Sequence, residues 1–336
     1  MTVSRSTVIW AFRMLLGRDP RSEEAIAAHM RAPSVDSLRE TIMRSPEFRE
    51  VIARKIPASG TVDDVDLASG PLRVEWRGSQ RQLLACIRRV RRSWQRLGNE
   101  KPFYSVLTDQ RFLPDTFVHH QADFWSSGEQ DVRALVALLT LHGIRNLNES
   151  VCFELGCGVG RLTIPLTRRF SRVVGLDVSR DHIAIAERHT ASLHIQNVGF
   201  RYCGNLNERW LGKCDVYYSR LVLQHNPPPL MAEFIRRGLC ALKPGGLAVL
   251  QVPTYRSGYD FDLVKWLGES IEGKIEMHCL PQSAVFELSH RCRCSLAEVR
   301  SDYAAGPEYI SKVFVIRKPG RERRAGRRTI QLGGHK

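Results

Sequence analysis

Apolar residues recur along this chain with two different periods, and the change of period separates two kinds of structure. Before about residue 150 the apolar positions lie three and four apart, as in Val8, Phe12 and Leu15, which is the spacing of amphipathic helices. From residue 151 onward, short continuous apolar runs alternate with helical stretches, which is typical of buried parallel strands joined by helices. The pattern therefore predicts a small all-α unit followed by an α/β domain with helices on both faces of its sheet.

The first part of the chain, residues 1–55, is expected to form a helical accessory module. Ser45 precedes Pro46, which places a capping hydroxyl before proline at a first helical position. Leu15–Pro20 and Ser45–Phe48 together resemble a small helical module of unassigned function that often accompanies bacterial carbohydrate-related and secreted repeat proteins. The resemblance implies no chemistry, and it gives only a leaning toward glycans.

A linker and a basic helix are expected next. Residues 56–79 begin with a stretch rich in Gly, Ser, Asp and Pro and are interpreted as a linker. Residues 80–102 form a basic amphipathic helix in which Ile87, Val90 and Leu97 mark an apolar stripe and arginines fill most positions between them. Three interpretations remain open: a surface helix packed on the following domain, a contact with an anionic surface, or a short intermolecular helix pair.

The strongest motif lies at the start of the α/β region. An apolar strand leads from Val151 to Glu154, then a turn holds three glycines at alternate positions from 156 to 160, and a helix is expected from Arg161. A second apolar strand ends at Asp177, an acid placed to hold a ribose at the tip of that strand. A dinucleotide fingerprint would need a small residue at position 161, so the spacing argues against a dinucleotide cofactor.

This E-x-G-x-G-x-G pattern resembles the first motif of class I S-adenosylmethionine-dependent methyltransferases. The resemblance covers residues 103–318 and implies a Rossmann-like seven-stranded methyltransferase sheet with S-adenosyl-L-methionine as cofactor. It also implies a set of cofactor-binding residues: Glu154, Gly156, Cys157, Gly158, Gly160, Asp177, Val178, Asn205, Leu206, Ser219 and Arg220. Members of this family usually carry an acid near position 205, so Asn205 is a departure, although its amide can still hydrogen-bond an adenine.

The resemblance implies transfer of a methyl group to an O or N atom of a small molecule or of a glycan- or lipid-linked precursor. In such a reaction the protein mainly aligns the reactants and excludes water. His225, after the fourth strand, is the candidate general base, and a histidine that only fixes the loop is the alternative. Arg220 is expected to face the cofactor or an anionic acceptor, with a plain surface arginine as its alternative. Tyr104, Trp125 and Gly128 are candidates either for a lid or for ordinary packing.

The run Asn226-Pro-Pro-Pro229 invites comparison with the motif of enzymes that methylate the amino groups of nucleic-acid bases. That motif needs an aromatic side chain to stack on a flipped base, and the fourth residue here is Pro229. The motif also belongs at the tip of the fourth strand, where this chain has Ser219 and Arg220. We therefore interpret the prolines as the start of a helix.

The charge of the chain is concentrated in two segments. The formal net charge is +15, residues 73–101 hold nine basic and two acidic side chains, and residues 317–336 hold eight basic and one acidic. The remaining 33 basic and 32 acidic residues balance. Residues 319–336 are interpreted as a basic disordered tail, and both segments are candidates for contact with an anionic surface. Two alternatives therefore stay open: an RNA- or protein-modifying methyltransferase recruited by these segments, or a non-catalytic scaffold that binds the cofactor.

The nine cysteines form no C-x-x-C pair, and Cys292 and Cys294 have no neighbours with metal-ligand spacing, so no metal site is expected. The apolar stretch near the N-terminus is interrupted by Arg13 and lacks a cleavage signal. No apolar run approaches the roughly 20 residues of a membrane helix. We therefore expect a cytoplasmic protein without a transmembrane segment.

Overall fold

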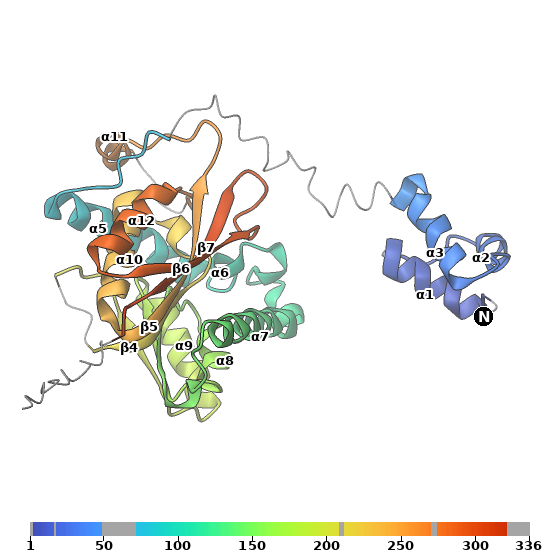
Figure 1. Ribbon diagram of the computed structural model, residues 1–336, viewed down its shortest axis with the longest axis horizontal. Helices are drawn as coiled ribbons and strands as arrows, with labels where there is room; N and C mark the ends of the chain where they lie inside the picture. Colours follow the sequence, from blue (N-terminus) through green and yellow to red (C-terminus); the bar gives the residue numbers. More distant parts are fainter. Residues whose placement is uncertain (1–2, 17, 49–71, 208–211, 270–273, 321–336) are drawn as a thin grey trace, which may run out of the picture. The chain divides into compact units, whose positions relative to one another are not determined.

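The structure is a computed structural model that describes residues 3–16, 18–48, 72–207, 212–269 and 274–320. The chain divides into two units, Met1–Ser69 and Gly70–Lys336, which are described separately (Figure 1). Most of the expected linker and nearly all of the expected tail fall outside the described residues.

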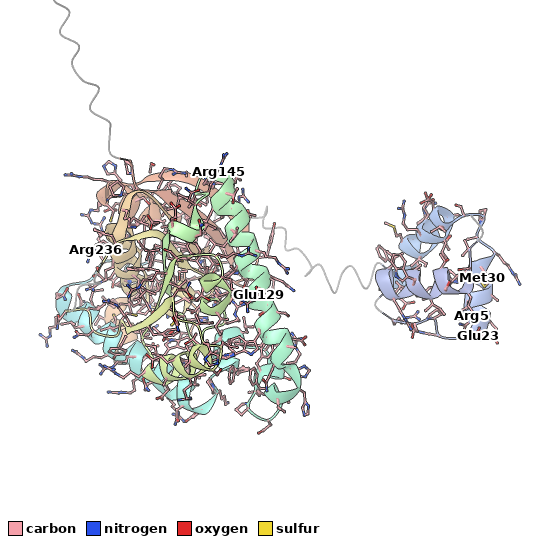
Figure 2. All side chains as sticks on the ribbon, turned by 90° about the horizontal axis from the view of Figure 1, so that it is seen from below. Arg5, Glu23, Met30, Glu129, Arg145 and Arg236 are labelled. Atoms are coloured by element: carbon pink, nitrogen blue, oxygen red, sulfur yellow. The ribbon has the colours of Figure 1, made fainter. Side chains whose placement is uncertain are left out.

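Among the described residues of the first unit, the helices with defined bounds are α1 (Arg5–Leu16), α2 (Glu23–Met30) and α3 (Val35–Arg44) (Figure 2). Ser22 and Ser34 cap α2 and α3 by accepting backbone N–H groups from Ala25 and Ser37. The helices enclose a small core whose members are Val3, Val8, Phe12, Leu16, Ile26, Leu38 and Ile42. The sequence prediction of helices here is consistent with these three elements.

The second unit is built on a seven-stranded sheet with the order β3-β2-β1-β4-β5-β7-β6. Its strands are β1 (Val151–Leu155), β2 (Arg172–Asp177), β3 (Val198–Tyr202), β4 (Cys214–Ser219), β5 (Leu242–Tyr255), β6 (Ser295–Asp302) and β7 (Ile310–Arg317). β7 pairs antiparallel with both β5 and β6, and the other neighbours are parallel. The predicted Rossmann-like seven-stranded sheet is confirmed. The antiparallel pair of β7 and β6 forms one of its ends.

Helices cover both faces of this sheet (Figure 1). Side chains alternate along β1, so Cys152 packs into the core under α7 (Phe117–Leu141) and α8 (Thr163–Thr167), while Phe153 packs into the core under α5 (Gln80–Glu100). The remaining helices of the unit are α6 (Tyr104–Leu107), α9 (Arg180–Ser192), α10 (Pro228–Ala241), α11 (Leu263–Gly268) and α12 (Gln282–Arg291). Because α10 begins at Pro228, the prolines start a helix as expected.

Two helices differ from the sequence prediction. The sequence predicts a helix from about Gly128 to Leu141, whereas α7 begins at Phe117. The regular helical spacing is interrupted before Gly128, where α7 has a kink at His120 (φ −125°) and an aromatic cluster surrounds Phe124. The helix expected from Arg161 begins at Thr163 and has only five residues. The glycine loop therefore extends further toward the helix than the sequence suggests.

The strand order reverses between β1 and β4. β2 and β3 follow on one side of β1, whereas β4 and β5 lie on the other side, and the carboxyl ends of these parallel strands meet at one edge. In open α/β sheets this reversal leaves a crevice that binds ligands. The glycine-rich loop after β1 opens into that crevice.

Candidate cofactor and active site

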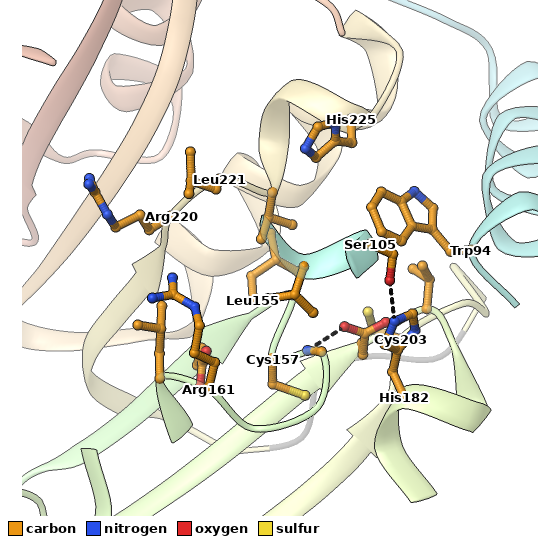
Figure 3. Close-up of a pocket in the computed structure, with 18 of the residues that line it drawn as sticks. Trp94, Ser105, Leu155, Cys157, Arg161, His182, Cys203, Arg220, Leu221 and His225 are labelled. Atoms are coloured by element: carbon orange, nitrogen blue, oxygen red, sulfur yellow. Dashed lines mark hydrogen bonds between the residues drawn. The ribbon is translucent and has the colours of Figure 1, made fainter. Parts of the chain in front are cut away.

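A pocket lies at the carboxyl ends of β1, β2 and β4, and it is lined by residues that the sequence places far apart (Figure 3). It brings together eight of the twelve residues singled out from the sequence: Glu154, Gly156, Cys157, Gly158, Asp177, Val178, Arg220 and His225. The switch point of the sheet and the predicted motif therefore coincide in one cavity.

The loop after β1 has a backbone that favours glycine. Gly156 has φ +72°, and a Cβ placed there would lie 2.3 Å from the nearer methyl of Val222. Gly158 has φ +52° and lies under Val106. Gly156 also donates its N–H to the Leu176 carbonyl at 2.7 Å. The loop thus brings bare backbone close to β2 and to the segment that follows β4, which leaves room for a ligand above it.

Asp177 ties the end of β2 to this loop. Its Oδ2 accepts the N–H of Gly158 at 2.8 Å and its Oδ1 accepts the N–H of Ser179 at 2.8 Å. The side chain is buried, yet it lines the pocket. Because a carboxylate offers about four acceptor positions, each oxygen keeps a free position for a ribose hydroxyl.

Glu154 lies on the floor of the pocket and is almost fully buried. It accepts the Thr163 hydroxyl at 2.6 Å. Burial raises the pKa of its carboxyl to about 8, although the Thr163 hydroxyl and the Arg161 guanidinium act in the opposite direction. A cationic ligand group would favour the ionised form of this carboxyl.

Two arginines share one carboxylate at the other side of the pocket. Arg161 donates to Asp131 at 2.8 Å, and Arg220 lies 2.9 Å from the second oxygen of Asp131. Arg161 is 3% exposed and its Nε makes no hydrogen bond. Figure 3 shows both guanidinium groups on the same side of the cavity. A buried guanidinium with an unused donor is suited to a ligand carboxylate.

Helices that precede the sheet cover the pocket. Trp94 of α5 and Ser105 and Val106 of α6 line it. Figure 3 shows Trp94 and Ser105 on the side opposite the two arginines. The Ser105 hydroxyl hydrogen-bonds Nε2 of the buried His182 at 2.8 Å, which holds α6 against α9. A Cβ on Gly98 would lie 2.7 Å from Nδ1 of His182, so α5 approaches α9 closely at this glycine.

His225 lies above the loop on a short 3₁₀ turn, Leu223–His225. Its Nδ1 lies 2.8 Å from the Glu276 carbonyl, which can only accept, so Nδ1 carries the proton and Nε2 is an acceptor. Burial lowers the pKa of this imidazole to about 4. The ring is therefore neutral at physiological pH, and its Nε2 accepts from the side-chain nitrogen of Gln224 at 3.4 Å. An O–H or N–H group of a ligand would have to replace this long contact.

Four predicted cofactor residues lie outside the pocket lining: Gly160, Asn205, Leu206 and Ser219. Ser219 donates to the Leu155 carbonyl at 3.4 Å, and Asn205 accepts the N–H of Asn207 at 3.1 Å. Leu206 belongs to the main core. Their cofactor role stays a prediction. Among the lid candidates, Gly128 lies against the backbone of Arg161, and Trp125 packs on His189 at 4.2 Å.

Sequence reasoning missed part of the lining, notably Ser105 and His182. Trp94 lies on the apolar stripe of the basic helix, and periodicity does not separate a stripe that faces a core from one that faces a pocket. Ser105 and His182 carry no local signal, because only the fold brings them together.

A sheet of this order with one inserted antiparallel strand, a glycine loop after β1 and an acid at the tip of β2 together define a class I methyltransferase domain. Residues 153–246 match the family model described as "Methyltransferase domain". The chain therefore contains a methyltransferase domain of the class I, S-adenosylmethionine-dependent type.

Curated relatives match the same region of the chain. A ubiquinone biosynthesis O-methyltransferase of Bradyrhizobium sp. (strain ORS 278) is 33% identical over 115 residues, which are 34% of this chain and 42% of that protein. A 23S rRNA (uracil(1939)-C(5))-methyltransferase of Legionella pneumophila (strain Lens) is 31% identical over 99 residues, 29% of this chain and 22% of that protein. The chain thus spans less than half the length of these relatives.

Solved structures are also similar. Magnesium protoporphyrin IX methyltransferase from Synechocystis PCC 6803 with bound SAH aligns with a TM-score of 0.44 at 22% identity, covering 59% of this chain and 86% of that one.

Among the described residues, no group of three or more His, Cys, Asp or Glu side chains is arranged to hold a metal ion. Within the same residues, no helix has the length and apolar character needed to cross a membrane.

Proposed function

We propose that this protein is an S-adenosylmethionine-dependent methyltransferase that acts on an O or N atom of a small molecule or of a glycan- or lipid-linked precursor. The observation that carries the proposal is the Asp177–Gly158 hydrogen bond in a pocket that also holds Glu154 and Arg161. Ribose acceptors, a carboxylate and an unused guanidinium donor thus line one cavity. These groups fit the hydroxyl, amino and carboxylate groups of the cofactor.

Different residues would bind different chemical groups of the cofactor. Asp177 would accept from the ribose hydroxyls, Glu154 would face the amino group, and Arg161 would hold the carboxylate. The bound cofactor would supply an activated methyl group on a sulfonium centre. Trp94 and Val106 narrow the pocket from the outside and would exclude water from it.

The acceptor would approach from the side of β4 that carries Arg220 and His225. Nε2 of His225 would accept a hydrogen bond from the O–H or N–H group to be methylated and so orient its lone pair. With a pKa of about 4, the imidazole is a weak proton acceptor, so orientation is the larger part of its role. We therefore propose that His225 mainly orients the acceptor. It would receive the proton of the acceptor late in the reaction, rather than remove it at the start as a strong general base.

The class of acceptor is not decided by the relatives, whose printed names refer to ubiquinone biosynthesis and to an rRNA uracil. The leaning toward a glycan rests on the N-terminal module, residues 1–55. A cytoplasmic location, expected from the sequence, remains a prediction.

The proposal is tested in two stages with the full chain. Calorimetry with S-adenosylmethionine should show binding to the wild-type protein and an affinity lower by about 100-fold or more for Asp177→Ala. A screen of alcohols, phenols, amines and glycan fragments with cofactor labelled in its methyl group should then find an acceptor that gains the label. Absence of cofactor binding would contradict the proposal. Binding without turnover across all acceptors would favour the scaffold alternative.

A second candidate, an RNA-modifying enzyme, is favoured by one observation. Several arginines of α5 gather in a groove on the surface beside the cofactor pocket. This candidate would be supported if labelled methyl groups appeared in RNA incubated with the protein and cofactor.

A further inference from the structure

The outer side of α5 forms a groove that the proposed reaction does not use. We call it the arginine groove and define it by Arg88, Arg91, Arg92, Arg96 and Arg180, together with Gln95, Asn99, Asp181 and Tyr202. Its volume is about 580 Å³. Trp94 lines the cofactor pocket while the adjacent Gln95 lines the groove, so one helix separates the two cavities.

The groove has a strong excess of positive charge. Among the described residues, five guanidinium groups and one carboxylate, that of Asp181, line it. Glu100, just beyond the groove, pairs with Arg96 at 2.8 Å. The remaining excess is unbalanced within the groove, and a concave surface with one sign of charge concentrates the opposite ion.

Several contacts hold the groove in shape without an acid. The guanidinium of Arg180 lies 4.1 Å from the centre of the Tyr202 ring, and Arg91 donates to the Tyr202 hydroxyl at 3.3 Å. The backbone N–H of Arg180 donates to the Gln95 side chain at 2.9 Å, which joins the start of α9 to α5. The positive groups are therefore displayed on two helices and a strand that are tied together.

The arginines form a line. Arg88, Arg92 and Arg96 are four residues apart on α5, so they lie on one face and rise by about 6 Å per step. Every basic residue that lines the groove is arginine, whose planar fork matches two oxygens of a phosphate. A line of such groups along a groove is suited to a linear ligand with repeated phosphates.

A membrane surface fits this helix less well. Its apolar side chains Ile87, Val90 and Leu97 are 1%, 2% and 5% exposed, because they pack into the protein. An interfacial helix needs an apolar face free to enter the lipid. The outer face of α5 therefore offers charge alone.

We propose that the arginine groove binds the phosphate backbone of a single strand of RNA. The contacts are made by guanidinium groups to phosphates, so binding is independent of base sequence and sensitive to salt. The groove lies outside the cofactor pocket, so this activity is separable from methyl transfer. The proposal assigns a ligand to the basic helix, for which the sequence alone leaves three interpretations open: packing on the domain, contact with an anionic surface, or an intermolecular helix pair.

The experiment compares two pairs of substitutions in the full chain. Arg88→Gln with Arg92→Gln removes two exposed arginines from the groove, and Arg133→Gln with Arg145→Gln removes two exposed arginines elsewhere, with the same change of charge. A fluorescent oligouridylate is titrated at several salt concentrations. Vesicles of phosphatidylserine and phosphatidylcholine are titrated in parallel, and calorimetry with S-adenosylhomocysteine verifies that the cofactor pocket is intact.

For the wild-type protein, phosphate contacts from the four arginines other than Arg96, which pairs with Glu100, should give a slope of log affinity against log salt of about −2.8. The groove pair should weaken binding by about tenfold at low salt and reduce the slope by about 1.4, while the control pair stays within about twofold of the wild type. The proposal is overturned if the wild type does not bind the oligouridylate at low salt. It is overturned equally if the groove pair binds like the wild type, if the control pair weakens binding as much, or if the protein binds only vesicles.

Discussion

Asp177 accepts the backbone N–H of Gly158 at 2.8 Å, which joins the end of β2 to the loop that follows β1. The same carboxylate accepts the N–H of Ser179, so it also orders the start of α9. One side chain therefore shapes the loop and presents acceptor positions to the pocket. Its loss affects the ligand and the loop together.

We expect Asp177→Ala to lower the affinity for S-adenosylmethionine by about 100-fold or more, because hydrogen bonds to a charged group contribute about 1.5–3 kcal/mol each. Asp177→Asn keeps one acceptor oxygen and should lose less. Calorimetry measures both affinities, and thermal unfolding controls for the fold. Wild-type affinity in the alanine variant would remove Asp177 from the site.

Gly156→Ala should abolish cofactor binding and lower stability, since its Cβ would lie 2.3 Å from Val222 in addition to the strain at φ +72°. Gly245 is a matched control, because it has φ +85° and nothing within 4 Å of its Cβ position. Gly245→Ala should cost about 1 kcal/mol in stability from the backbone alone and leave cofactor binding intact. Equal effects of the two substitutions on binding would show that close packing of the loop is unimportant.

Glu154 should make cofactor binding depend on pH. Its pKa of about 8 means that the carboxyl is mostly protonated at pH 7, and a cationic amino group favours the ionised form. Affinity should therefore rise from pH 6 to pH 8 by up to about tenfold per pH unit, with release of a proton on binding. Glu154→Gln should bind weakly, without the part of this rise that belongs to Glu154. Calorimetry in buffers of different ionisation enthalpy measures the proton.

The raised pKa of Glu154 affects the stability of the fold in the opposite direction, because stability falls as pH rises while cofactor affinity increases. A carboxyl whose pKa is higher in the folded state than in the unfolded state stabilises the fold at low pH and loses this contribution as pH rises. For Glu154 the loss should extend from about pH 4.5 to about pH 8. Glu154→Gln should flatten the pH dependence of the melting temperature across this range, and an unchanged curve would contradict the raised pKa.

His225→Ala should reduce turnover by about 10- to 100-fold and leave cofactor affinity within about twofold. Because the imidazole has a pKa of about 4, the wild-type rate should show no step between pH 5 and pH 8 that belongs to His225. Rates are measured as formation of S-adenosylhomocysteine with the acceptor found by the screen. Turnover that is unaffected by the substitution would exclude His225 from orientation and from proton transfer.

Gly98→Ala tests the cover of the pocket. In an ordinary helix this change is stabilising by up to about 1 kcal/mol. Here the added Cβ would lie 2.6 Å from the Ser179 hydroxyl and 2.7 Å from His182, so we expect a loss of about 1–3 kcal/mol in urea unfolding. Asn99→Ala, on the same helix but exposed, should change stability by less than about 0.5 kcal/mol.

The sequence predicted the sheet well because its central strands are buried on both faces and read as continuous apolar runs. It predicted the floor of the site because Glu154, Gly156 and Asp177 belong to a local strand–loop–strand unit. It did not predict which side chains cover the pocket. Ser105, His182 and Trp94 come from three helices and meet only through packing, and a helical stripe has the same period whether it faces a core or a ligand.

The position of α5 between two cavities has a thermodynamic consequence. Trp94 lines the cofactor pocket and the neighbouring arginines line the groove, so a ligand in either cavity contacts the same helix. If occupation of the groove changes cofactor affinity by some factor, occupation of the cofactor pocket must change groove affinity by the same factor. The helix α5 would then couple the two cavities, and the affinity of the groove for its ligand would depend on whether the cofactor pocket is occupied.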